Sequence, residues 1–96
     1  MRRDDAIFNW LQIEIVREAR PNDRSARDTV QFFEEMLRED HQVSSISKKL
    51  VKGVYHVEYQ LEGEHEVKTI QFPQELAEKL LQDIMSEPKY NQSFDG

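Results

Sequence analysis

The sequence predicts an α+β fold in two layers, with the element order αα-βββ-α and the helices on one face of a three-stranded antiparallel meander. The first observation is that two isolated glycines, Gly53 and Gly63, divide the stretch from Val43 to Phe72 into three runs of alternating apolar and polar residues. Such alternation is typical of strands with one buried face. The second observation is that apolar residues recur at helical spacing before and after this stretch.

The two glycines also predict how the strands pair. We expect Lys52-Gly53 to form the centre of a type I′ turn and Gly63-Glu64 the centre of a type II′ turn. Directly opposed residues of an antiparallel pair share a face. Both turns then assign the same four apolar residues of the middle strand to the inner face: Tyr55, Val57, Tyr59 and Leu61.

Two helices are predicted before the sheet. The first spans Asp4 to Ala19, and the second runs from a cap at Asp23 or Ser25 to about Glu39. Because the connection between them is only a few residues long, they should form an αα-hairpin.

One helix is predicted after the sheet. Pro73 suits its first turn, where a missing N–H costs nothing, and Pro88 lies just beyond its end. Its apolar residues form one continuous stripe: Leu76, Ala77, Leu80, Leu81 and Ile84.

The first helix carries a second apolar patch away from its main stripe. Trp10, Ile13 and Val16 make up this patch, and Phe32 likewise points off the core stripe of the second helix. A helix that is apolar around much of its circumference is buried on more than one side. This patch of the first helix is therefore either internal or a contact with a partner, such as a second copy, and its three residues together with Phe32 are the candidate interaction surface.

The composition is that of a soluble globular protein. Of the 96 residues, 38% are hydrophobic and 33% are charged, with a net charge of −6. This length suits a single compact domain, which we place at residues 1–86. Polar and turn-forming residues dominate residues 87–96, which predicts a mobile C-terminal tail.

The sequence also predicts a compartment. There is no cysteine, which excludes disulfides and thiolate chemistry. No segment reaches the roughly 18 apolar residues that a membrane helix needs, and no signal peptide is evident. We therefore expect a cytoplasmic protein without a membrane contact.

The outer face of the predicted sheet carries the main polar constellation, which consists of Lys49, His56, Glu58 and Thr69. A histidine and a carboxylate two residues apart could form an acid/base pair or two ligands of a metal. A metal site needs three or four ligands, and the chain has no HExxH, GxSxG or glycine-rich phosphate loop. A solvated sheet face is the simpler interpretation, so we expect no metal, no cofactor and no small-molecule substrate.

Lys48, Lys49 and Lys52 form the single basic patch of this acidic chain. A strong nucleic-acid site neutralises about 6–10 phosphates, so three lysines are too few for tight binding. The simpler interpretation is that these lysines are solvated and protect an edge strand from aggregation. Weak association with nucleic acid through this turn is the alternative.

The order helix, three antiparallel strands, helix across Ser25 to Met85 resembles the topology of double-stranded RNA-binding domains. Those domains carry a basic cluster at the start of their final helix. Here the corresponding positions hold Gln74, Glu75 and Glu78, and only Lys79 is basic. The resemblance concerns topology and does not imply RNA binding.

A non-enzymatic protein-interaction domain, adaptor or regulatory, is the function that the sequence favours. A homodimer is one form that this interaction could take. Two alternatives belong to other classes: a nucleic-acid-associated protein acting through the lysine turn, and a small enzyme that uses His56 and Glu58.

Overall fold

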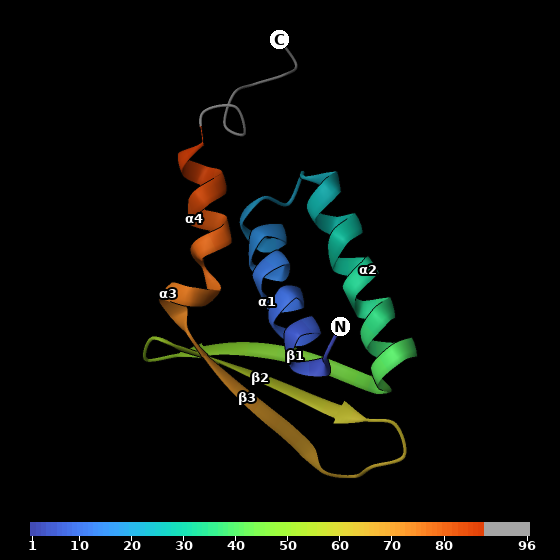
Figure 1. Cartoon of the computed structure of the whole chain (residues 1–96). Coiled ribbons are helices and arrows are strands. Elements are labelled where there is room, and N and C mark those ends of the chain that lie inside the picture. Colours follow the sequence, from blue (N-terminus) through green and yellow to red (C-terminus); the bar gives the residue numbers. More distant parts are fainter. Residues whose placement is uncertain (88–96) are drawn as a thin grey trace.

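Helices α1, α2 and α4 pack on one side of an antiparallel sheet, and α3 connects the last strand to α4 (Figure 1). The computed structural model describes residues 1–87, so the predicted tail beyond Glu87 lies outside the described residues. The elements in chain order are α1 (Arg3–Ala19), α2 (Arg24–His41), β1 (Val43–Val51), β2 (Val54–Leu61), β3 (Val67–Pro73), α3 (Gln74–Ala77) and α4 (Lys79–Ser86). This confirms the predicted α+β class and the three-stranded meander.

The strand order is β1-β2-β3, and the register is the predicted one. Val51 pairs with Val54 across a turn in which Lys52 has a φ of 51° and Gly53 a φ of 79°. A type I′ turn requires positive φ at both central residues, which explains the glycine. Tyr55 then pairs with Phe72 on β3. The inner-face residues of β2 are all buried, as predicted: Tyr55, Val57, Tyr59 and Leu61.

The prediction of a two-residue turn at Gly63-Glu64 is wrong, although the register that it implied is right. The backbone N–H of Glu64 donates to the carbonyl of Leu61 over 3.1 Å, which makes Gly63 the third residue of the turn. Its φ of 81° is what a type II turn requires at that position. Residues 62–66 form a longer loop, after which Gln60 still pairs with Val67.

A β-bulge at the start of β1 was not predicted. Val43 pairs with Leu61, whereas Ser45 pairs with Gln60, so Ser44 is the extra residue on β1. The bulge allows Val43 to face the core on the same side as Ile46, although three positions separate them. It also gives the start of β1 a local bend beside α2.

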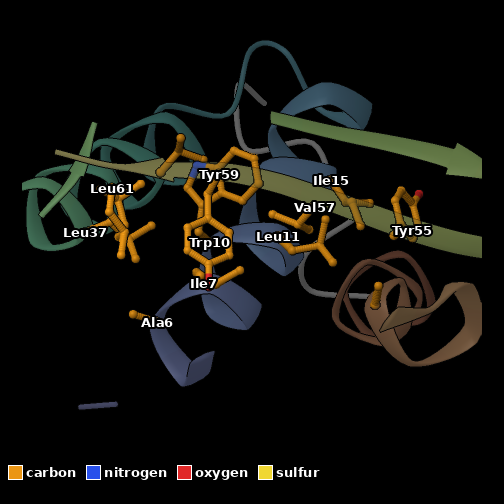
Figure 2. Packing of buried hydrophobic residues seen from close by; sticks show 13 residues of the cluster. Ala6, Ile7, Trp10, Leu11, Ile15, Leu37, Tyr55, Val57, Tyr59 and Leu61 are labelled. Atoms are coloured by element: carbon orange, nitrogen blue, oxygen red, sulfur yellow. The ribbon is translucent and has the colours of Figure 1, made fainter. Parts of the chain in front are cut away.

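Helix α1 occupies the centre of the core. It lies between α2 and α4 (Figure 1), and the side chains of Ile7, Leu11 and Ile15 are directed toward the inner face of the sheet (Figure 2). Trp10 and Val16 are only 3% and 1% exposed. A helix with neighbours on both flanks and a sheet beneath it needs apolar residues on several faces, which explains the second patch.

The alternative in which this patch contacts a partner therefore does not hold for Trp10 and Val16. Trp10 and Val16 are buried within the chain itself, and Ile13 packs against the core while partly buried. The patch is therefore mainly buried inside the domain. Only Phe32 of the four candidate interaction residues is exposed, at 57%.

The single helix predicted after β3 is broken into α3 and α4. Glu78 at the break has φ −94° and ψ 1°, and its carboxylate accepts hydrogen bonds from Tyr55 Oη (2.6 Å) and Gln74 Nε2 (3.1 Å). The break lets α3 remain on the sheet while α4 runs beside α1 (Figure 1). The predicted apolar stripe is also not uniformly buried, since Ala77 is fully buried whereas Leu76 is 49% exposed.

Two hydrogen bonds attach the junction between α3 and α4 to the sheet. The first backbone N–H of α3, from Gln74, donates to the carbonyl of Gly53 over 2.9 Å and so joins the helix to the β1-β2 turn. Burial, together with the hydrogen bond to Glu78, raises the pKa of Tyr55 above its usual value. Tyr55 thus stays a neutral donor and connects the middle strand to the break between the helices.

The cap of α2 is Asp23, one of the two predicted candidates. Its carboxylate accepts a hydrogen bond from the backbone N–H of Ala26 over 3.1 Å and another from Arg20 Nε over 3.2 Å. The hydrogen bond from Ala26 is the main cause that holds the pKa of Asp23 below its usual value. Asp23 therefore stabilises the fold in its ionised form.

We expect Asp23→Ala to lower the free energy of unfolding by about 0.5–2 kcal/mol at neutral pH. Because the pKa is lower in the folded state, this stabilisation is complete above the ordinary value of 3.8 and is lost as the pH falls through the folded value. Urea unfolding compares neutral pH with strongly acidic pH, with Asp23→Asn as the control that keeps an accepting oxygen without the charge. An equal deficit of Asp23→Ala at both pH values would contradict the assignment.

Candidate functional site

Strand β1 is an outer strand of the sheet, and within residues 1–87 one of its edges pairs with no other strand, so we call it the free edge. In a hairpin with a two-residue turn, the residues that flank the turn exchange both backbone hydrogen bonds, and bonded pairs alternate from there. Starting from the Val51–Val54 pair, this alternation points the backbone N–H and C=O groups of Ile46, Lys48 and Leu50 away from β2. No backbone hydrogen bond from another described element reaches these three residues.

A groove of about 580 Å³ runs between α1 and α2. Its lining consists of Glu14, Arg17, Arg27, Val30, Gln31, Glu34, Glu35 and Arg38. The contributions of α2 recur at three- and four-residue intervals, which places them along one side of that helix. Polar atoms dominate the lining because the apolar side of each helix faces the core.

A second, smaller hollow joins this groove to β1. Its volume is about 180 Å³, and it is lined by Glu34, Leu37 and Arg38 of α2 together with residues 43–46 of β1. Glu34 and Arg38 line both hollows. The groove between the helices thus continues to the bulged start of β1, beside the first of its outward backbone groups at Ile46.

The carboxylates of the groove are engaged within the chain. Glu14 accepts two hydrogen bonds of 2.6 Å from Arg17, and this contact raises the pKa of the guanidinium further. Glu34 accepts a hydrogen bond from the indole N–H of Trp10 over 3.1 Å. Glu35 accepts one from Gln31 over 3.4 Å.

Two cations of the groove are not engaged in this way. Arg27 and Arg38 are exposed and make no ion pair or side-chain hydrogen bond with another residue of the described chain, 1–87. Arg38 also lines the hollow beside β1. The groove therefore offers two guanidinium groups, each with a planar set of donors that suits carboxylates.

The predicted polar constellation lies on the opposite face of the sheet. Lys49 pairs with His56 and Glu58 pairs with Thr69, as the predicted register requires. The Lys49 Nζ to Glu58 distance is 3.9 Å, and both side chains are well exposed, so this ion pair is weak. His56 makes no side-chain hydrogen bond within residues 1–87, and that part of the chain contains no cluster of three His, Cys, Asp or Glu side chains able to hold a metal.

The three lysines of the β1-β2 turn do not form one solvated patch. Lys48 faces the helices, where its Nζ lies 2.5 Å from Glu18 of α1 and its side chain is only 14% exposed. Lys49 is on the outer face, and Lys52 is in the turn. The interpretation of all three as solvated lysines is therefore wrong for Lys48, because alternation along the strand separates neighbouring side chains.

Phe32 is isolated from the other candidate interaction residues. Its ring contacts Phe33 edge to face, with centroids 5.3 Å apart, and it does not line the groove. One exposed aromatic ring is ordinary on a protein surface. Phe32 is therefore not part of the candidate site.

Sequence patterns did not single out the groove, although one signal for it exists. Arg27, Gln31, Glu34 and Arg38 follow one another at intervals of three or four residues, which marks a polar stripe along a helix. Such a stripe is ordinarily a solvated helix face. Only the positions of α1 and β1 beside it turn the stripe into the wall of a groove.

No helix within residues 1–87 is both long enough and apolar enough to cross a membrane. Comparisons with protein-family models, with curated proteins and with solved structures find no match to this chain.

Proposed function

We propose that this chain is a non-enzymatic protein-interaction domain that holds an extended segment of a partner protein along the free edge of β1. The observation that carries the proposal is that the backbone N–H and C=O groups of Ile46, Lys48 and Leu50 point away from β2. They lie along an edge that begins next to the groove between α1 and α2. In strand addition, backbone hydrogen bonds supply affinity and neighbouring hollows supply specificity. The β1 edge combines both features.

Other surfaces support an interaction less well. The free edge of β3 ends in Pro73, which has no N–H to donate. A homodimer through α1 loses its support because Trp10 and Val16 are buried. The hypothesis of nucleic-acid binding through the lysine turn has less support, because Lys48 is already paired with Glu18.

Replacing Lys48 by proline tests the proposal, and Lys48→Ala is the matched control. Both variants remove the ion pair with Glu18, but only proline removes the outward backbone N–H. That N–H makes no bond to β2, so proline should be tolerated at this edge. We expect Lys48→Ala to retain partner binding and Lys48→Pro to bind about tenfold more weakly, because a buried hydrogen bond would lose its donor.

The measurement starts with affinity capture from an extract of the native host and continues with the purified partner, whose dissociation constant is determined for each variant. Circular dichroism verifies that both variants are folded. Equal binding by Lys48→Pro and Lys48→Ala would show that the partner does not use the edge. A chain that captures no partner but converts a small molecule in a His56-dependent reaction would replace the proposal with an enzymatic function.

A further inference from the structure

We infer that the segment bound along β1 is acidic, with carboxylate side chains at alternate positions that point toward α1 and α2. This inference rests on the proposed function, since it concerns the chemistry of the partner at the same edge. It starts from the unequal engagement of charges in the groove. Among the described residues, 1–87, the carboxylates of Glu14, Glu34 and Glu35 accept hydrogen bonds, whereas Arg27 and Arg38 make none.

The charge of the surrounding region also favours an acidic segment. The three arginines and three glutamates that line the groove cancel. Lys48, Lys49 and Lys52 on β1 and its turn outnumber the two carboxylates paired with them, Glu18 and Glu58, which leaves a net charge of +1 on the groove and strand together. The whole chain carries −6, so this region has the opposite sign to the rest of the molecule. Such local complementarity gives specificity and speeds association.

The geometry of strand addition determines where the carboxylates would lie. A side chain directly opposite Ile46 shares its face of the sheet, which is the face toward the helices. The hollow on that side of Ile46 contains Arg38. A glutamate at this position of the added strand can therefore reach the unpaired guanidinium, and the next inward position is two residues along.

The same features disfavour other occupants. A second copy of β1 would place three further lysines against Lys48, Lys49 and Lys52, and opposed like charges are destabilising. A nucleic acid has no peptide groups with which to extend the sheet, and no aromatic residue lines the groove for base stacking. An acidic polypeptide satisfies both the backbone edge and the guanidinium of Arg38 beside it.

Titration of the ¹⁵N-labelled chain with synthetic peptides tests the inference. The probe is a nine-residue peptide, blocked at both ends, that alternates glutamate with valine and threonine, and its twin carries glutamine in place of every glutamate. We expect the glutamate peptide to shift the amide signals of Ile46, Lys48 and Leu50 and to bind about tenfold more tightly than the twin. N-methylation of the alternate peptide residues whose N–H groups face β1 should abolish binding. N-methylation of the residues between them, whose N–H groups face away from β1, should not.

Two arginine substitutions on α2, one inside the groove and one outside it, test the role of the guanidinium group. Arg38→Gln should weaken the glutamate peptide about fivefold and leave the glutamine twin unchanged. Arg24→Gln is the control, because Arg24 is an exposed arginine of the same helix that does not line the groove. We expect it to have no effect beyond about twofold.

The outcomes separate this inference from the proposed function. Equal affinity for the two peptides at the β1 edge would overturn the acidic preference and leave strand addition in place. If neither peptide shifts the β1 signals while partner binding still depends on Lys48→Pro, the inference fails and the function stands. Tighter binding of a single-stranded oligonucleotide, weakened by Arg38→Gln, would overturn the inference in favour of nucleic acid.

Discussion

Trp10→Ala is expected to lower the free energy of unfolding by about 3–5 kcal/mol, which is a large part of the stability of a small domain. The indole is only 3% exposed and belongs to the core cluster beneath α1 and α2. Its removal leaves a cavity among residues that cannot collapse fully into it. It also removes the N–H that bonds Glu34, whose carboxylate is part of the groove wall.

Urea unfolding followed by circular dichroism measures this effect, because the variant loses the only tryptophan of the chain as a fluorescent probe. Phe32→Ala is the matched control. Phe32 is 57% exposed, so its truncation should change stability by no more than about 0.5 kcal/mol. Equal effects of the two substitutions would contradict the placement of Trp10 in the core and would restore this side chain as a surface for a partner.

The sheet could be predicted in detail because its information is local. Gly53 and Gly63 each have positive φ, and the alternation of each strand leaves one register with a uniformly apolar face. The turn type at Gly63 was missed, since glycine suits either central position of a turn with positive φ. The bulge at Ser44 was missed as well, because it depends on the packing of Val43 against the core.

Features that depend on contacts distant in sequence were not predictable in the same way. The pattern of α1 indicates two apolar faces, but only the positions of α2 and α4 determine that Trp10 is internal. The break after α3 involves a hydrogen bond between Glu78 and Tyr55, which lie 23 positions apart. Neither residue signals this contact on its own.

The candidate site follows the same division. The predicted placement of His56 and Glu58 on one sheet face is correct. Within residues 1–87, however, their one side-chain interaction is the exposed 3.9 Å ion pair of Glu58 with Lys49. The groove, in contrast, combines charged residues from two helices with the edge of β1. Charged stripes on separate helices look like solvated faces until tertiary structure brings them together.

Leu37→Ala should destabilise the fold by about 2–5 kcal/mol, whereas Leu76→Ala should cost less than about 1 kcal/mol. The chemical change is identical, and Leu76 lies on the apolar stripe predicted for the last helix. Leu37 is 1% exposed, and its burial attaches α2 to the core beside Val43. Leu76 is 49% exposed, although it lies on α3 next to the fully buried Ala77.

Chemical unfolding followed by Trp10 fluorescence and by circular dichroism compares the two leucine variants under the same conditions. Coincident transitions from the two probes are expected for a single cooperative unit, since Trp10 and Leu37 belong to one core cluster. If Leu76→Ala instead proves as costly as Leu37→Ala, the exposure of Leu76 in this structure would be contradicted. A small effect of Leu37→Ala would mean that α2 is not attached to the core through this residue, and the wall of the groove beside β1 would then not be fixed in place.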